Sequence, residues 1–184
     1  MSTIQIDREV HNDASVWGTA IKWGIIGALI NSALTMVWYN LGMMDLNEDG
    51  SQSSLIPMLA GIAIGIGMMI LGLKEYRDKA NAGELTMGRG IIWSLAYGLI
   101  GGIVAGIFVY LFYSVLAPDF LVTMQAAQEA QLEEQGITGS DLEAAMESIS
   151  TFMSPAFMVV YSLLWSLLAS LIIGAIISLI LKTR

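Results

Sequence analysis

The sequence predicts an all-α, polytopic membrane protein with four antiparallel transmembrane helices. Apolar residues make up 55% of the 184 residues, charged residues make up only 13%, and the apolar residues gather in four long runs. Each run reaches about 20 residues, the length that an α-helix needs to cross roughly 30 Å of hydrocarbon. A soluble bundle would place polar residues on its outer faces, whereas stretches 99–112 and 163–180 contain no charge.

The predicted spans cover residues 16–39, 55–73, 91–116 and 156–181, all within one membrane domain of residues 1–184. The first span follows a largely polar tail, residues 1–15, that contains three acids. We therefore interpret this span as a retained anchor rather than a cleaved signal peptide.

The charge pattern predicts the orientation. The Lys and Arg residues are Arg8, Lys22, Lys74, Arg77, Lys79, Arg89, Lys182 and Arg184. All eight lie on one side of the spans, and the two opposite connections, 40–54 and 118–155, carry ten of the sixteen acids. Because short loops that keep Lys and Arg stay cytoplasmic, we expect a bacterial inner (plasma) membrane protein with both termini in the cytoplasm. The absence of a basic patch excludes nucleic acid as a partner.

The connection 118–155 predicts an extracytoplasmic amphipathic helical hairpin. Asp119 can cap a first helix near residues 120–135, and Ser140 with Glu143 forms a capping box for a second helix, 141–152. Ser154 and Pro155 suit the first positions of span four. We expect the hairpin to dock on the bundle ends; the alternatives are the membrane interface or a partner.

Small residues recur at four-residue intervals in every span, which favours close approach of helix backbones. The predicted helix-packing residues are Gly24, Ala28, Gly61, Gly65, Gly98, Gly102, Gly106, Ser166, Ser170 and Gly174. The favoured interpretation is packing of the four helices within one chain. The alternative is a seam with another membrane protein or a second copy.

Three segments carry a resemblance to a known family. They read Glu-Tyr-Arg-Asp-Lys at 75–79, Gly-Glu-Leu-Thr-Met-Gly at 83–88 and Ala-Pro-Asp-Phe at 117–120. The chain resembles the domain of unknown function family numbered 4199, which implies a four-span inner-membrane protein of the Bacteroidota. The family-motif residues are Tyr76, Arg77, Asp78, Pro118 and Asp119. The resemblance implies an architecture and no particular chemistry.

The first outer connection holds one candidate metal site. Asp45, Asn47 and Asp49, followed by Gly50, match the first half of a calcium-binding loop. Ile56 stands where a bidentate Glu should complete the site, so a polar turn is the competing interpretation. We expect no other cofactor.

Within the spans, Lys22 is the only charged residue and Asn31 the only side-chain amide. We expect Lys22 to reach the headgroups and Asn31 to bond between helices. With no catalytic constellation, we favour a non-enzymatic structural or accessory subunit that contacts the lipid bilayer and another membrane protein or itself. The alternatives are a small-solute transporter or channel, and a membrane enzyme that uses outer carboxylates with a metal. Those carboxylates are Asp119, Glu129, Glu133 and Glu134.

Overall fold

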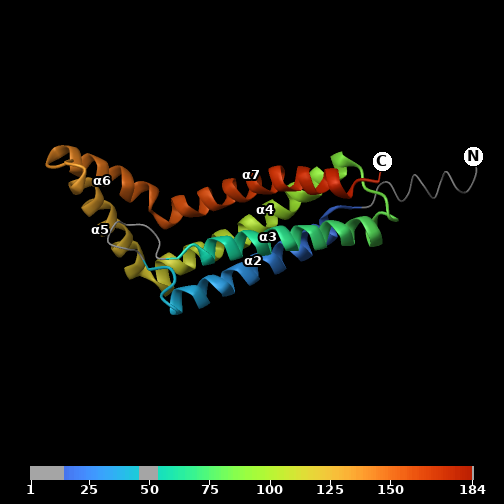
Figure 1. The fold of residues 1–184 in the computed structure, drawn as a ribbon, viewed down its shortest axis with the longest axis horizontal. Helices are drawn as coiled ribbons and strands as arrows, with labels where there is room; N and C mark the ends of the chain where they lie inside the picture. Colours follow the sequence, from blue (N-terminus) through green and yellow to red (C-terminus); the bar gives the residue numbers. More distant parts are fainter. Residues whose placement is uncertain (1–14, 46–53, 184) are drawn as a thin grey trace, which may run out of the picture.

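A computed structural model describes residues 15–45 and 54–183 (Figure 1). The α-helices are α2 (Trp17–Asn40), α3 (Ile56–Glu75), α4 (Met87–Leu111), α5 (Pro118–Glu134), α6 (Ser140–Phe152) and α7 (Pro155–Leu181). Two π-helical turns, η1 (Tyr76–Ala80) and η2 (Phe112–Leu116), extend α3 and α4. Four of these helical segments are long and apolar enough to cross a membrane, which confirms the predicted fold class.

The helix of the third span begins at Met87, before the apolar run that starts near residue 91. Thr86 has an extended backbone, and its hydroxyl accepts a hydrogen bond from the Arg89 N–H at 3.4 Å. This side-chain cap satisfies one of the free N–H groups of the first turn, so the helix can start outside the apolar run. Span four begins as expected, because the Ser154 hydroxyl accepts from the Phe157 N–H at 3.3 Å.

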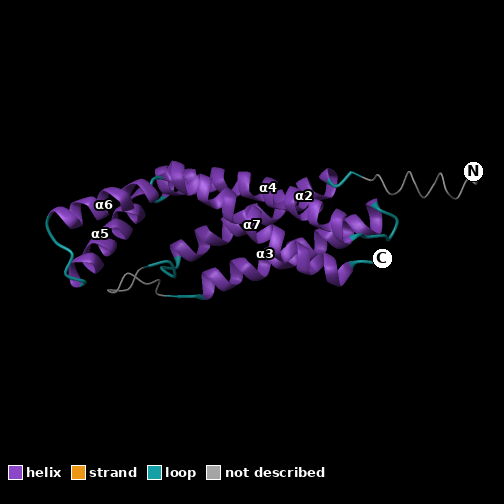
Figure 2. Ribbon diagram, turned by 90° about the horizontal axis from the view of Figure 1, so that it is seen from above, coloured by secondary structure: helices purple, strands orange, loops and turns teal. Residues whose placement is uncertain are grey.

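Helix α4 is central to the arrangement of the spans. It packs most extensively on α7 and next on α2, whereas α3 packs mainly on α2 (Figures 1 and 2). Contact between α3 and α7 is sparse. The four spans therefore form an unevenly packed bundle, in which α3 has few contacts with either α4 or α7.

The two ends of the bundle differ in charge. The described cations lie at the end where α3 and α7 finish, which we call the basic end: Lys22, Lys74, Arg77, Lys79, Arg89 and Lys182. There the Thr183 N–H donates to the Leu85 carbonyl at 3.0 Å, and the Leu85 N–H donates to the Thr183 hydroxyl at 2.9 Å. Helices α5 and α6 lie beyond the opposite end, which we call the acidic end (Figure 1).

Each end of the bundle has a small hydrophobic core. The core at the basic end contains the fully buried residues Leu73, Tyr76, Leu85 and Trp93. The core at the acidic end surrounds Phe112 and consists mainly of aromatic edge-to-face contacts with the neighbouring rings Tyr39, Tyr113 and Phe120. Between these two cores the spans rely on small residues, and the packing leaves hollows.

The start of each helix in the connection 118–155 differs from the prediction. Pro118 begins α5, so Asp119 lies in the first turn and does not cap the helix. The residue before α6 is Gly139 (φ 63°), and Ser140 is already helical, so the capping box does not form. Gly139 tolerates this left-handed conformation at no steric cost, which allows the helix to begin one residue earlier than the box requires.

Helices α5 and α6 project beyond the bundle (Figure 1) instead of folding back onto its end. They pack on each other, α5 also contacts η2, and α6 makes only a small contact with α7. No residue of α6 is buried. The expectation of docking on the bundle end is therefore wrong for α6, which packs mainly on α5.

Candidate functional site

Helices α4 and α7 are joined by a ladder of small residues. The contacts repeat every four residues, forward along α4 and backward along α7. Each contact pairs a glycine of one helix with a serine of the other, and a Cβ added to the glycine would meet the serine side chain. The five rungs are Gly90 with Ser178, Ser94 with Gly174, Gly98 with Ser170, Gly102 with Ser166 and Gly106 with Ser162. We call this set the glycine–serine ladder.

The ladder brings the two backbones into direct contact. A Cβ at Gly98 would overlap the Ser170 side chain and lie 2.9 Å from the Ser166 carbonyl oxygen. The Ser166 hydroxyl donates across the seam to the Gly98 carbonyl oxygen at 2.9 Å. In a bilayer, such close approach with an interhelical hydrogen bond is the main source of helix association. The ladder therefore makes α4 and α7 a rigid pair.

Helix α2 meets α4 in the same way at Gly24, where an added Cβ would lie 3.0 Å from the Tyr97 carbonyl oxygen. Ala28 is also buried in α2. Helix α3 is held at its last turns, since a Cβ at Gly72 would lie 2.6 Å from the Trp93 ring and 2.8 Å from Trp23. The contacts at Gly24 and Gly72 both lie toward the basic end of the bundle.

Gly61 and Gly65 of α3 occupy a different environment from the ladder glycines. Among the described residues outside the same helical turns, no atom lies within 4 Å of a Cβ built at Gly65, and a Cβ at Gly61 would meet only the Asn31 Oδ1 atom, at 3.3 Å. Both glycines line a hollow of 440 Å³ that all four spans surround. We take this hollow, together with Asn31 and Tyr97 on its wall, as the candidate functional site.

The polar groups of the hollow are few and mostly satisfied within the protein. The Tyr97 hydroxyl donates to the Gly65 carbonyl oxygen at 3.4 Å, and the hydroxyls of Ser162 and Ser170 donate to carbonyls of their own helix. The Asn31 Nδ2 atom donates to the Gly27 carbonyl oxygen at 3.2 Å. In the described part of the chain, no donor reaches the Asn31 Oδ1 atom. This amide therefore bonds within α2 rather than between helices.

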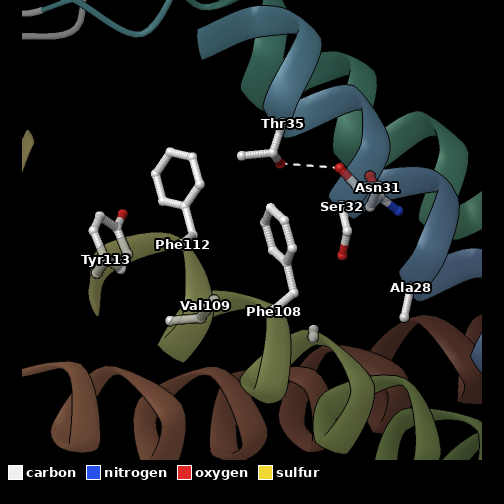
Figure 3. Close-up of a pocket in the computed structure, with 9 residues that line it drawn as sticks. Ala28, Asn31, Ser32, Thr35, Phe108, Val109, Phe112 and Tyr113 are labelled. Carbon is white, nitrogen blue, oxygen red and sulfur yellow. Dashed lines mark hydrogen bonds between the residues drawn. The ribbon is translucent and has the colours of Figure 1, made fainter. Parts of the chain in front are cut away.

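A second, smaller hollow of 270 Å³ lies between α2 and α4, nearer the acidic end (Figure 3). Phe108 and Phe112 point into it from α4 and η2, opposite Ser32 and Thr35 of α2. The Thr35 hydroxyl donates to the Asn31 carbonyl oxygen at 2.9 Å. Asn31 lines both hollows, so the one amide of the spans stands between them.

An ion pair links α2 and α3 at the basic end. The Lys22 Nζ atom lies 2.8 Å from one Glu75 oxygen and 3.0 Å from the other, and the Trp23 indole N–H donates to the same carboxylate at 2.7 Å. Lys79, four residues along the helix from Glu75, lies 3.8 Å from it. Sequence reasoning missed the Lys22–Glu75 pair. The sequence does contain a signal for this pair. Lys22 lies about one turn after the start of the first span, and Glu75 lies at the end of the second span, which runs antiparallel to the first.

The family-motif residues are divided between the two ends. Tyr76 is fully buried in the core at the basic end, and its hydroxyl accepts from Arg89 at 3.2 Å. Arg77 and Asp78 pair with each other at 2.6 Å. Pro118 and Asp119 start α5 at the acidic end and are exposed. The structure does not bring the two groups together, so they do not form one site.

The candidate calcium loop lies largely outside the described residues. Asp45 is described, with its carboxylate beside Gly42 (φ 68°), whereas Asn47 and Asp49 are not. Within residues 15–45 and 54–183, no group of three His, Asp or Glu side chains could hold a metal ion.

Together, these features define a multi-pass α-helical membrane protein with an apolar interior and hollows between its spans. The chain belongs to the family described as "Protein of unknown function (DUF4199)", whose model matches residues 22–183. The matched region includes the ladder, both hollows and the α5–α6 pair. No curated protein and no solved structure matches the chain.

Proposed function

We propose that this protein is a non-enzymatic accessory subunit of an assembly in a bacterial inner membrane, with both termini in the cytoplasm. The observation that carries the proposal is the projection of α5 and α6 beyond the bundle, with no buried residue in α6. A helix pair held away from its own bundle leaves its surface free for another protein. The rigid α4–α7 pair provides a firm mount for it.

The charge of the projecting pair suggests the kind of partner. Residues 118–155 contain seven Asp and Glu and no Lys or Arg. Surfaces of opposite charge speed encounter and fix orientation, so a basic surface is the complementary partner. The membrane orientation follows from the basic end, since short Lys- and Arg-bearing loops stay in the cytoplasm. The α5–α6 pair would then lie on the outer side.

The test is photocrosslinking in the native membrane from a reactive amino acid placed at Ser148, which is exposed on α6. We expect one crosslinked polypeptide that recurs between preparations. Glu129→Gln, Glu133→Gln and Glu134→Gln together should reduce its yield severalfold, whereas Gln131→Ala with Gln135→Ala, at the last turn and the C-cap of the same helix, should not. Crosslinks to lipid alone, or equal yields in both variants, would contradict the proposal.

The 440 Å³ hollow favours a second candidate function, transport of a small solute. It lies among the spans, where transporters place their substrates. No charged side chain lines it among the described residues, which argues against ion coupling. Flux of uncharged solutes into reconstituted vesicles above that of empty vesicles would support this function.

The outer carboxylates offer a third, enzymatic possibility only with a metal. Asp119, Glu129, Glu133 and Glu134 are all exposed on α5, and only residues three or four apart face each other on a helix. Asp119 is therefore remote from the other three. Support for a metal-dependent enzyme would require that an added cation shifts the thermal stability of the protein. The shift would also have to disappear when Glu129 and Glu133 are mutated.

A further inference from the structure

We propose that the 440 Å³ hollow binds one neutral, single-chain amphiphile of the long-chain alcohol class, taken from the bilayer, whose hydroxyl donates a hydrogen bond to the Asn31 Oδ1 atom. This site is separate from the α5–α6 surface. A failure of one proposal therefore leaves the other intact.

The size of the hollow fits a small ligand better than a helix. Ligand pockets have volumes of about 300–1,000 Å³, and those between helices are mostly apolar with a few polar groups. The hollow has 440 Å³, and its walls include Ile62, Ile66 and Met69 of α3 and Trp165 and Ile173 of α7. A whole transmembrane helix, about 10 Å across, needs more room than this.

The lining excludes an ionised headgroup. Its described residues include no Lys, Arg, Asp, Glu or His. A phosphate or carboxylate placed there would be a buried charge without a counterion, which is strongly unfavourable in hydrocarbon. The ligand must therefore be neutral at the position of Asn31.

The hydrogen bonds of the lining point to a donor on the ligand. The hydroxyls of Tyr97, Ser162, Ser166 and Ser170 all donate to backbone carbonyls. The Asn31 Oδ1 atom is left as an acceptor on the wall of the hollow, 3.3 Å from a Cβ built at Gly61. A polar group without a partner in hydrocarbon is costly, so a ligand that donates a proton there is favoured over a plain alkyl chain.

The hollow opens sideways, toward the lipid. Ile62 of α3 and Trp165 of α7 line it and are 50% and 59% exposed, so the hollow is not sealed between these two helices. Met69, only 3% exposed, belongs both to the lining and to the core at the basic end, and so closes the hollow there. A chain can therefore enter between α3 and α7 directly from the membrane.

The test uses photoreactive hexadecanol, with a diazirine in its chain, and the purified full-length protein in phosphatidylcholine nanodiscs. We expect crosslinks on the wall residues of α3 and α7, displaced by excess hexadecanol. Gly65→Leu fills the hollow and should lower labelling about tenfold. Gly67→Leu is the matched control: a Cβ there also meets no atom within 4 Å, but Gly67 does not line the hollow, so labelling should not change.

Two comparisons test the headgroup. Photoreactive hexadecane should label several times more weakly than the alcohol, and Asn31→Leu should abolish this difference. Hexadecyl phosphate should compete at least tenfold less well than hexadecanol. Equal labelling of wild type and Gly65→Leu would overturn the site. Equal labelling by alkane and alcohol would show that ordinary lipid tails fill the hollow, and would overturn the proposed ligand.

Discussion

Gly98 of α4 and Ser170 of α7 lie so close together that one carbon added at Gly98 would overlap the serine side chain. The same overlap recurs at Gly90 with Ser178 and at Gly174 with Ser94, and looser contacts with serine continue the ladder at Gly102 and Gly106. Lipid tails are as apolar as leucine, so the hydrophobic effect that holds soluble helical bundles together does not drive helix association in a bilayer. Close packing along the ladder takes its place.

Gly98→Ala should destabilise the protein by about 1–3 kcal/mol, the usual cost of overpacking a tight contact. The measurement is the free energy of unfolding in mixed detergent micelles. Gly88→Ala is the control, because no atom lies within 4 Å of a Cβ at Gly88. Equal effects at the two positions would mean that helix propensity, not the ladder, governs the result.

The rung formed by Gly90 and Ser178 should tolerate exchange of its two residues. Gly90→Ser alone should destabilise, since a Cβ there would overlap the Ser178 side chain. Adding Ser178→Gly removes that side chain and should restore most of the lost stability, because residues in contact are strongly coupled. The thermal midpoints of both single variants and the double variant measure this coupling. Simple additivity would contradict the rung.

Glu75→Gln and Lys22→Met should each lower the thermal midpoint, and the double variant should lose less than the sum. Glu75→Gln leaves Lys22 without its counterion at the edge of the apolar region, and Lys22→Met leaves Glu75 with only the more distant Lys79. In the protein, Lys22 and Glu75 are 2.8 Å apart. The control pair is Arg77→Met with Asp78→Asn, which lies outside this link between helices. Additive losses at 22 and 75 would show that the pair does not connect α2 to α3.

The orientation can be tested by single cysteines, because the chain has none of its own. Ser140→Cys, exposed at the first position of α6, should react with a membrane-impermeant thiol reagent added to intact spheroplasts. Ala82→Cys, exposed between η1 and α4, should react only after the membrane is permeabilised. The reversed pattern would place the termini outside.

The spans could be predicted from the sequence because apolar length alone decides which segments can cross a bilayer. The ladder's residues were also predictable, but its register was not. Small residues every four positions on two helices fit together in several registers, and only the assembled pair selects Gly98 opposite Ser170. By the same spacing, Gly61 and Gly65 looked like packing residues, although they line a hollow.

The start of α6 and the ion pair show two further limits. Ser140 and Glu143 satisfied the pattern of a capping box, but Gly139 adopts a left-handed conformation that local patterns do not reveal. The Lys22–Glu75 pair depends on how α2 and α3 are positioned relative to each other along the bundle axis. That position is set by the packing of Gly72 against Trp23 and Trp93, which the sequence does not specify.

The most direct test of the accessory-subunit account is native mass spectrometry of the protein extracted gently from its own membrane. The account predicts a stoichiometric complex with a second polypeptide, which is lost when Glu129, Glu133 and Glu134 are changed to Gln. A bare monomer or a complex of this chain with itself alone, obtained under conditions that preserve other membrane assemblies, would contradict it.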